Sequence, residues 1–426
     1  MTHASIAIRP TTKRAHVALG AAGVATVLVG AHVANDALTS MLSGLLPTLQ
    51  ARHGLADTTL ALLVAALALS ASVSQPVLGG LSDRFGARRV AAAGTAFGIS
   101  MLSLMTVAPN TAALFGLLLL GGLGSAAFHP AATSLLAATP LRRRELGAGL
   151  FSAGGTIGLA LGPLVVLVAA ATLGLGFVPW LIVPAVVLGG VLYRLVPAEP
   201  PHTRTDRARV LDASLLRGPV GALAAAATFG SVAFVAFTSA YPLFLVRERG
   251  IEPSDPLIGM TLAAFNFGAA GGAVVAGLLA NRVERRALVA VTLVGSLVPL
   301  GLLLVGSPTG PAYVLAVAAA GALLNANLPI LLVVAHRLAP DRTAAASGML
   351  MGLPVGLAGL LYVGVGGLQE ALGVGPALGV AFLAVLPAAA IAAIALGRGA
   401  AGPVESRTAA CRCAASRSCA FAPQLS

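Results

Sequence analysis

Residues 79–89, GGLSDRFGARR, form a short polar stretch between two long apolar runs at residues 56–79 and 90–108. Each run is long enough to cross a hydrocarbon layer of roughly 30 Å as a helix. The glycines and charged side chains between the runs suit a tight turn at a membrane surface. The same alternation of apolar run and polar turn continues along most of the chain. The stretch therefore predicts a helical hairpin in a lipid bilayer, one of several in the chain.

The composition supports this interpretation for the whole chain. Of the 426 residues, 58% are hydrophobic and only 9% are charged, whereas about a quarter of the residues in a soluble domain are charged. The net charge of +12 would suit a protein that binds nucleic acid. However, the Lys and Arg residues form short clusters at the ends of apolar runs, and aromatic residues make up only 4% of the chain. Nucleic-acid binders instead combine a basic patch with aromatic side chains, so we expect a lipid bilayer and no nucleic acid as the partner.

Twelve apolar runs have the length of a membrane-spanning helix. The sequence therefore predicts an all-α membrane protein of twelve transmembrane helices. Their approximate bounds are residues 17–49, 56–79, 90–108, 111–138, 146–170, 175–197, 218–246, 257–280, 287–306, 310–337, 344–368 and 374–397.

The two halves of the chain resemble each other. A polar segment separates six predicted helices from the next six, and several motifs recur at offsets of 198 to 200 residues: Gly79, Asp83, Arg84, Pro130 and Pro140 return as Gly277, Asn281, Arg282, Pro329 and Pro340. Parallel six-helix repeats with a solute site between them are a known transporter architecture. We therefore expect a tail (1–16), a six-helix bundle (17–197), a linker (198–217), a second bundle (218–397) and a disordered tail (398–426).

The positive charges predict the orientation in the membrane. If both termini and the linker are cytoplasmic, all but three of the 26 Lys and Arg residues lie on the cytoplasmic side; the exceptions are Arg52, Arg247 and Arg249. Cytoplasmic segments of membrane proteins carry such an excess of cations. We therefore expect a multi-pass protein of the cytoplasmic (plasma) membrane.

Few titratable groups fall inside the predicted helices. Asp36 is the one acidic residue in mid-span, His32 lies one turn earlier on the same face, and His129 lies in the fourth helix. A charge near the bilayer centre costs several kcal/mol, so such residues usually line a pathway or relay protons. The sequence therefore predicts proton coupling at these three residues. Alternatively, Asp36 is neutral and bonded to Asn35, and His129 donates to a carbonyl that Pro130 leaves free.

The pair His32 and Asp36 also has the spacing of two metal ligands on one helix face. Metal sites usually need three or four ligands, and only His129 is available to add. We therefore expect neither a metal nor a cofactor. A hydrolytic enzyme would need a positioned nucleophile and base, and no G-x-S-x-G elbow surrounds a serine, so we expect no enzyme activity.

A solute cavity between the two bundles would draw its polar groups from residues inside the predicted helices. No Lys or Arg lies in the middle of any of them, since Arg194 and Arg337 lie at helix ends, and this favours a neutral or weakly cationic, partly apolar solute. The candidate cavity residues are Asn35, Ser40, Phe128, Pro130, Asn266, Asn325 and Asn327.

The stretch at residues 79–89 matches the G-x3-D-R-x-G-x-R-R signature of the major facilitator superfamily at every defined position. This resemblance implies a secondary transporter that acts by alternating access. Asp83 would pair with neighbouring cations and helix dipoles in one conformation. The gating motif would comprise Gly79, Asp83, Arg84, Gly86, Arg88 and Arg89, and a partial antiporter motif on the fifth helix would comprise Gly149, Gly158, Gly162 and Pro163.

Three further stretches resemble the fosmidomycin-resistance group of this superfamily: AHVAND at residues 31–36, GLGSAAFHP at residues 122–130, and the segment from Gly154-Gly155 to Gly162-Pro163. The resemblance implies a proton-driven exporter of a small toxic compound. One departure is that Leu118 and Gly121 stand where many drug–proton antiporters carry Arg and Gln. Coupling of protons to transport would therefore rest on the Asp and His residues. We also expect the chain to function as a monomer. Uptake by proton symport and metal-ion transport remain alternatives.

Overall fold

The computed structural model describes residues 19–142, 144–197, 213–279, 282–339, 346 and 349–399. Within these residues the secondary structure is helical, with no strand. The predicted tail at residues 1–16 lies outside the described residues. So do most of the linker and of the C-terminal tail, and the repeat residues Asn281 and Pro340.

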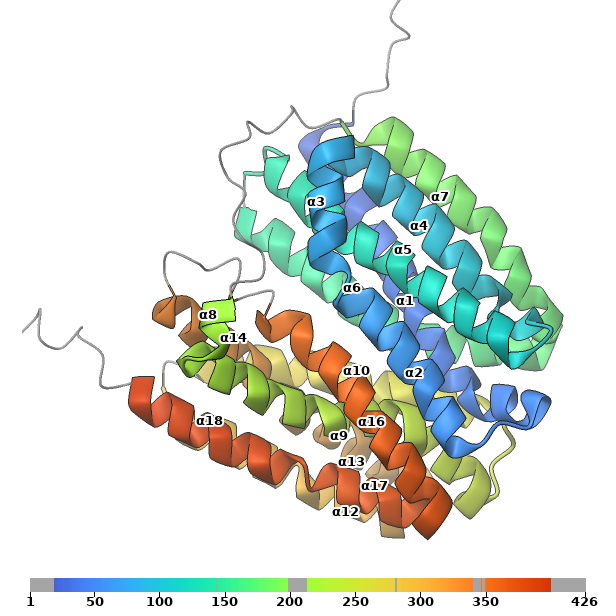
Figure 1. Cartoon of the computed structure of the whole chain (residues 1–426), viewed down its shortest axis with the longest axis vertical. Coiled ribbons are helices and arrows are strands. Elements are labelled where there is room, and N and C mark those ends of the chain that lie inside the picture. Colours follow the sequence, from blue (N-terminus) through green and yellow to red (C-terminus); the bar gives the residue numbers. More distant parts are fainter. Residues whose placement is uncertain are drawn as a thin grey trace, which may run out of the picture.

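The helices before residue 198 form one group, seen in blue to green in Figure 1. Short 3-10 helices at Leu104–Val107 and Leu175–Leu181 extend the ends of two of them. The group comprises α1 (Ala21–His53), α2 (Asp57–Ser72), α3 (Gln75–Phe85), α4 (Ala87–Ser103), α5 (Thr111–Ala138), α6 (Arg144–Leu173) and α7 (Ile182–Leu195).

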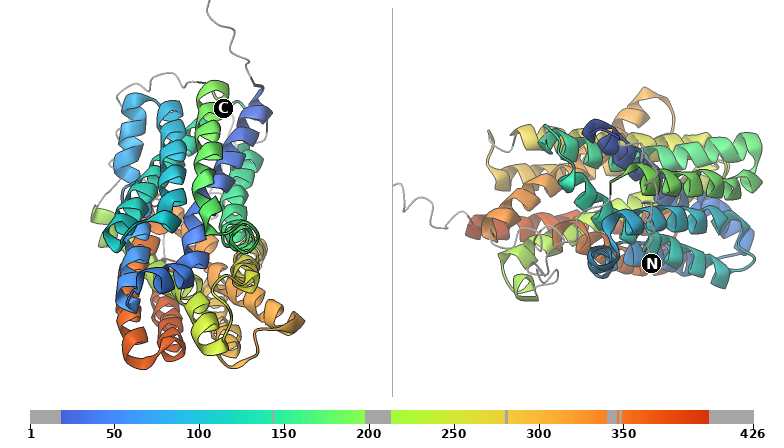
Figure 2. Two further views of the ribbon diagram at one scale, coloured as in Figure 1. Left: turned by 90° about the vertical axis from the view of Figure 1, so that its right-hand side faces the viewer. Right: turned by 90° about the horizontal axis from the view of Figure 1, so that it is seen from above.

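The helices after residue 212 form the second group, and Figure 2 shows the two groups side by side from two further directions. The second group comprises α8 (Ala213–Leu216), α9 (Pro219–Arg249), α10 (Pro256–Leu279), α11 (Arg285–Gly295), α12 (Leu297–Val305), α13 (Gly310–Asn325), α14 (Asn327–Leu338), α16 (Leu353–Leu372), α17 (Val374–Phe382) and α18 (Val385–Gly399).

Eleven helical spans among the described residues are long and apolar enough to cross a membrane. The remaining segment is the pair α2 and α3, of which α2 is a shorter apolar helix. The segment predicted at residues 56–79 is therefore present but divided into two helices. The break lies just before Pro76, which has no N–H to bond the carbonyl of Ser72 and which instead occupies the first turn of α3. With this pair the chain has the expected number of segments.

The stretch at residues 79–89 is not the loop that the sequence suggested. Residues 79–85 belong to α3, and α4 begins at Ala87, so Gly86 alone makes the turn with φ of 91°. Glycine adopts this left-handed φ without strain, which lets one helix follow directly on the other. In α4, the guanidinium of Arg88 lies 5.0 Å from the centre of the Tyr193 ring. The side chain of Asp83 lies outside the described residues.

Several glycines bring helix backbones into contact. A Cβ on Gly124 of α5 would overlap the backbone of Gly98 in α4, and a Cβ on Gly162 of α6 would overlap the carbonyl oxygen of Ala37 in α1. Small residues at helix crossings allow this close approach, which drives helix association in lipid. Packing therefore accounts for these glycines without any solute.

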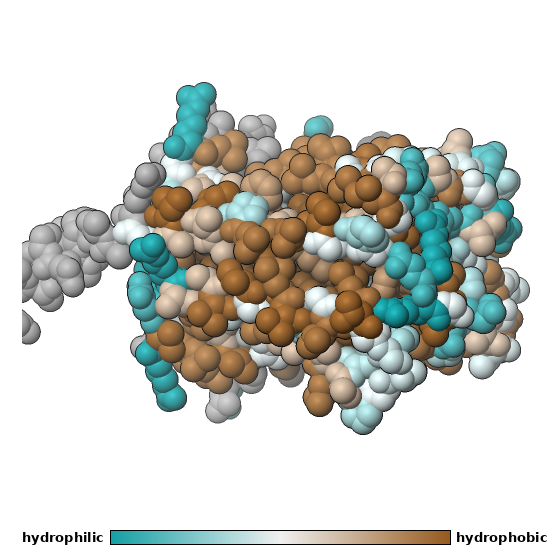
Figure 3. All heavy atoms as spheres, turned by 90° about the horizontal axis from the view of Figure 1, so that it is seen from below, coloured by the Kyte–Doolittle hydropathy of each residue, from teal (hydrophilic) through white to brown (hydrophobic). Residues whose placement is uncertain are grey.

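The outer surface matches a protein that sits in lipid. Figure 3 shows apolar side chains across the middle of one face and polar side chains gathered towards two opposite edges. Large apolar residues are widely exposed, among them Val77, Leu315 and Val305, which is 78% exposed. Hydrocarbon around the protein removes the cost that such surface would have in water.

The two groups of helices meet at one end of the molecule, where α2 packs against α16, and diverge towards α3 and α18 (Figure 1). We call this the closed end; α1 ends there at His53 and α9 ends there at Arg249. Arg247 of α9 binds Asp57 of α2 with both guanidinium nitrogens, at 2.5 and 2.8 Å.

Other hydrogen bonds support this ion pair. The Gln50 amide donates to Asp57 at 2.6 Å, and both the N–H and the hydroxyl of Thr58 donate to Glu370 of α16 at 2.8 Å. Asp57 is only 6% exposed. The predicted bounds put this residue at the start of the second helix, and the structure shows that it also joins the two groups.

We expect Asp57→Asn to loosen the closed end. Removing one charge of a buried pair costs several kcal/mol, but the Arg247 side chain is 37% exposed, so we expect a shift of about 1–2 kcal/mol. Spin labels at Ala56 and Glu252, both exposed, should then show a second, longer label-to-label distance in double electron–electron resonance. The charge-swapped pair Asp57→Arg with Arg247→Asp should restore the short distance. An unchanged distance in Asp57→Asn would contradict a role for the pair.

Candidate functional site

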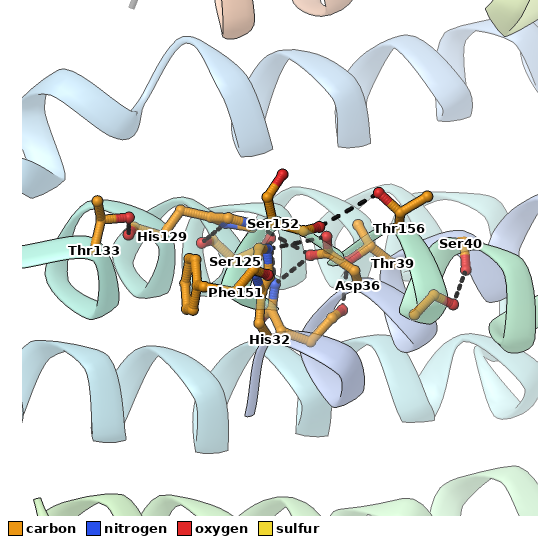
Figure 4. A network of polar contacts seen from close by, with 12 residues as sticks. His32, Asp36, Thr39, Ser40, Ser125, His129, Thr133, Phe151, Ser152 and Thr156 are labelled. Carbon is orange, nitrogen blue, oxygen red and sulfur yellow. Dashed lines mark hydrogen bonds and ion pairs between the residues drawn. The ribbon is translucent and has the colours of Figure 1, made fainter. Parts of the chain in front are cut away.

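Three titratable side chains converge inside the first group of helices. His32 and Asp36 lie one turn apart on α1, and His129 reaches them from α5 (Figure 4). The Nε2 atom of His32 lies 3.2 Å from Oδ2 of Asp36, and the Nε2 atom of His129 lies 3.1 Å from Oδ1. The structure thus brings together the three residues that the sequence predicted for proton coupling. We call them the His–Asp–His cluster.

Helix α6 closes the third side of the cluster. The carbonyl oxygen of Phe151 accepts a hydrogen bond from Nδ1 of His32 at 2.8 Å, and the two rings lie 4.2 Å apart. Gly155, one turn later, leaves the space that the polar atoms occupy: a Cβ there would lie 2.6 Å from Nε2 of His32 and 2.7 Å from Oδ2 of Asp36. The sequence analysis did not assign Phe151 or Gly155 to the site, although Gly155 lies in a stretch of the fifth helix that carries the family resemblance.

His129 is held by its own helix. Its Nδ1 atom donates to the carbonyl oxygen of Ser125 at 2.8 Å. The carbonyl that Pro130 leaves without a partner is that of Ala126, four residues before the proline. His129 therefore does not serve the carbonyl that Pro130 frees, which was the alternative explanation of this residue.

Asn35 adds a neutral donor beside the carboxylate. Its Nδ2 atom donates to the hydroxyl of Ser125 at 2.9 Å and lies 3.2 Å from Oδ1 of Asp36. The expected contact between Asn35 and Asp36 therefore exists together with the two histidine contacts and does not replace them.

The cluster is shielded from bulk water. The His32 side chain is 9% exposed, that of Asp36 is 14% exposed and that of His129 is 25% exposed. Each long helix packed against α1 carries its Arg, Asp and Glu residues near its ends. The cluster is therefore a small titratable island within an apolar bundle.

The three side chains offer three ligand atoms that all lie within 4.8 Å of one another, and they are the candidate metal group among the described residues. Two imidazoles and one carboxylate suit a transition-metal ion chemically. A structural site usually has four protein ligands. The three side chains are therefore one ligand short of such a site, whereas each of them can bind a proton.

A cavity of about 190 Å³ lies between the two groups of helices. Ser40 and Asn266, which the sequence proposed, line it, and so does Thr39, which lies three residues after Asp36 on α1. The Nδ2 atom of Asn266 donates to the carbonyl oxygens of Leu262, at 2.9 Å, and Leu159, at 3.4 Å. The cavity is also lined by four residues with hydroxyl groups that the sequence analysis missed, namely Ser43, Ser72, Thr238 and Ser239.

The other proposed cavity residues lie elsewhere. Phe128 is fully buried and packs against His32, and Pro130 faces Gly79 of α3. Asn325 ends α13, and the buried Asn327 starts α14, where its amide donates to the carbonyl of Leu324. None of these four residues is among those that line the cavity, and neither is Asn35, which contacts Ser125 and Asp36 instead.

The partial antiporter motif lies along the contact between α6 and α1. Gly158 faces Val33 and Asp36, and Pro163 faces Gly44. Gly149, the first residue of the motif, faces open space. Most of the motif therefore sets the distance between α6 and the cluster.

The model of the Major Facilitator Superfamily matches residues 28–363. The chain belongs to this superfamily. It is also 26% identical over 357 residues to the "Fosmidomycin resistance protein" of Escherichia coli (strain K12), covering 82% of this chain and 86% of that protein. The "Uncharacterized MFS-type transporter YfnC" of Bacillus subtilis (strain 168) is 26% identical over 377 residues, covering 84% of this chain and 90% of that protein. The chain is thus a multi-pass membrane protein of a transporter family.

Solved structures of similar fold are also transporters. A bacterial homologue of the human lysosomal transporter Spinster, in an inward-facing and unoccupied conformation, superposes with a TM-score of 0.69 at 17% identity; the match covers 91% of this chain and 98% of that one. The nucleoside transporter NupG superposes with a TM-score of 0.69 at 14% identity, covering 90% and 99%. At these identities the likeness shows the fold alone.

We expect Gly155→Ala to impair transport because its methyl group would push His32 and Asp36 apart. Overpacking costs about 1–3 kcal/mol, so the rate of solute flux should fall by roughly tenfold or more. The matched control is Gly154→Ala, whose methyl group would meet Val29 at 3.1 Å and not the cluster. Initial rates in proteoliposomes, at equal amounts of reconstituted protein, compare the two. Equal losses in both variants would contradict a specific role for the space at Gly155.

Proposed function

We propose that this chain exports a small solute from the cell by alternating access, driven by protons that enter in exchange. The observation that carries the proposal is the convergence of His32, Asp36 and His129 one turn from a cavity between the two helix groups. The proposal places the protein in the cytoplasmic membrane with both termini cytoplasmic, as the distribution of Lys and Arg favours.

The cost of burying charge supports proton coupling. Ionisable groups inside a membrane persist where they bind, relay or exchange ions, because hydrocarbon penalises them by several kcal/mol. An imidazole exchanges its proton within the physiological pH range, and two of them contact the same carboxylate. Such a group can take protons from one side of the membrane and release them to the other as access alternates.

The position of the closed end supports a conformation in which the cavity is closed to the outside. With the expected topology this end faces outward, and Asp57 and Arg247 seal it. Protons reach the cluster from outside only after that ion pair separates. The stretch with Gly79, Asp83, Arg84, Gly86, Arg88 and Arg89 lies at the opposite end of the first group. We assign it the matching role of stabilising the conformation that is closed to the cytoplasm.

The cavity supports a small and largely uncharged solute. Its described lining contains hydroxyl groups, one amide and apolar side chains such as Leu67, Phe234 and Leu262, and it contains no Lys, Arg, Asp or Glu. The similarity to a protein named for fosmidomycin resistance makes that antibiotic the first compound to test. All these elements occur within one chain, so we expect a functional monomer.

Uptake of a solute together with protons is the second candidate. The cluster and the cavity suit both directions of coupling, because exchange and symport differ only in which loaded states reorient. Resistance of a drug-sensitive host to a panel of neutral, cationic and anionic toxins would support export. Increased sensitivity to one of them would support uptake instead, and accumulation of a divalent metal would support a metal carrier.

We expect Asp36→Asn to abolish solute movement driven by a pH gradient while exchange of labelled for unlabelled solute continues. The amide has nearly the shape of the carboxylic acid but cannot bind and release a proton. Flux in proteoliposomes with and without a pH gradient, using fosmidomycin and one neutral and one cationic member of the panel, measures both modes.

The matched control is Thr39→Val, which changes the next cavity residue on α1 but no titratable group. It should alter solute affinity and keep the dependence on the pH gradient. Wild-type flux driven by the gradient in Asp36→Asn would falsify the assignment.

A further inference from the structure

We infer that the His–Asp–His cluster holds two exchangeable protons, one on each contact between a histidine Nε2 atom and the Asp36 carboxylate. The inference deepens the proposed function and rests on it for its role in transport. It adds the number of protons and the way in which the backbone fixes their positions.

The first step concerns Nδ1 of each ring. In His32 this atom lies 2.8 Å from the carbonyl oxygen of Phe151, and in His129 it lies 2.8 Å from that of Ser125. A backbone carbonyl can only accept a hydrogen bond. Both Nδ1 atoms must therefore carry hydrogen, in the neutral as well as the charged ring.

The second step concerns Nε2. A neutral ring with hydrogen on Nδ1 has a lone pair on Nε2. In His32 that lone pair would point at Oδ2 of Asp36, 3.2 Å away, and in His129 at Oδ1, 3.1 Å away. Two lone pairs at these distances repel unless a proton lies between them. Each contact needs its own proton, because the two rings use different carboxylate oxygens.

The third step is the charge balance. With both protons present the cluster carries a net charge of +1, whichever atoms hold them, and without them it carries −1. The helices packed against α1 supply no other charge at this level. On α5 the neighbours are Ser125 and Phe128, and on α6 they are Phe151 and Gly155. Charged residues of the other helices packed against α1 lie near the helix ends. This holds for the Arg, Asp and Glu residues of α2, α4, α6, α7 and α9, and α10 has none.

The emptied cluster has one compensating donor. Asn35 directs Nδ2 at Oδ1 of Asp36, at 3.2 Å, so its amide can strengthen this contact when the proton between Asp36 and His129 leaves. Asn35 is therefore a positioning residue for the unloaded state. Exchange of a neutral solute for two protons would also carry two positive charges inward in each cycle, so the membrane potential would drive transport together with the pH gradient.

The test measures the protons directly, without any solute. The full-length protein, with ¹⁵N-labelled histidine and in lipid nanodiscs, is titrated while ¹⁵N shifts assign each ring as charged, neutral with hydrogen on Nδ1, or neutral with hydrogen on Nε2. Spectra of His32→Gln and His129→Gln assign the two signals, and His53 at the end of α1 serves as an internal reference.

The expected result is that both rings change between the charged form and the form with hydrogen on Nδ1, so that two protons leave per protein. In Asp36→Asn, one contact should be satisfied by the new amide donating to a neutral Nε2, and the other ring loses the negative charge that stabilises its charged form, so neither ring should exchange a proton over the wild-type transition. Hydrogen on Nε2 of a neutral ring, or one ring that never changes charge, would overturn the inference. If both rings behave as expected but a pH gradient drives no flux, the proposed function fails and the two-proton site stands.

Discussion

The contact of two histidines with one carboxylate, inside an apolar bundle, is the interaction on which the rest of this account depends. Hydrocarbon penalises an isolated charge by several kcal/mol, and Asp36 is not isolated, because an imidazole nitrogen of His32 and one of His129 each lie within 3.2 Å of its carboxylate. The surrounding helices serve this arrangement. Gly155 and Gly158 let α6 approach α1, and two backbone carbonyls fix the orientation of the rings.

The two halves of the chain divide the work. The first half holds the titratable cluster, while the second half adds Thr238, Ser239 and Asn266 to the cavity wall. Binding of solute can therefore depend on both halves, whereas binding of protons depends on one. The two events meet on α1, where Asp36 and Thr39 are one turn apart. Movement of the two halves about the cavity would then couple solute binding to proton binding. The ion pair between Asp57 and Arg247 would have to break during this movement.

The sequence predicted what local patterns encode. Apolar runs located the membrane helices, and the rarity of embedded charge singled out His32, Asp36 and His129. It could not predict contacts between distant residues of ordinary type. Asp57 and Arg247 are 190 residues apart, and Ser43, Thr238 and Gly155 look like any small residue of a membrane helix. The one-residue turn at Gly86 was missed because apolar length does not report where one helix ends and the next begins.

The most direct test of proton-driven export is the direction of proton movement. Proteoliposomes that contain a pH-sensitive dye would be preloaded with an exported compound from the toxin panel and diluted, with the membrane potential clamped. Efflux of the compound through cytoplasmic-side-in protein should acidify the lumen, because protons enter as solute leaves. Alkalinisation would mean that protons leave with the solute, as in a symporter, and an unchanged lumenal pH during efflux would mean that the His–Asp–His cluster does not couple protons to transport.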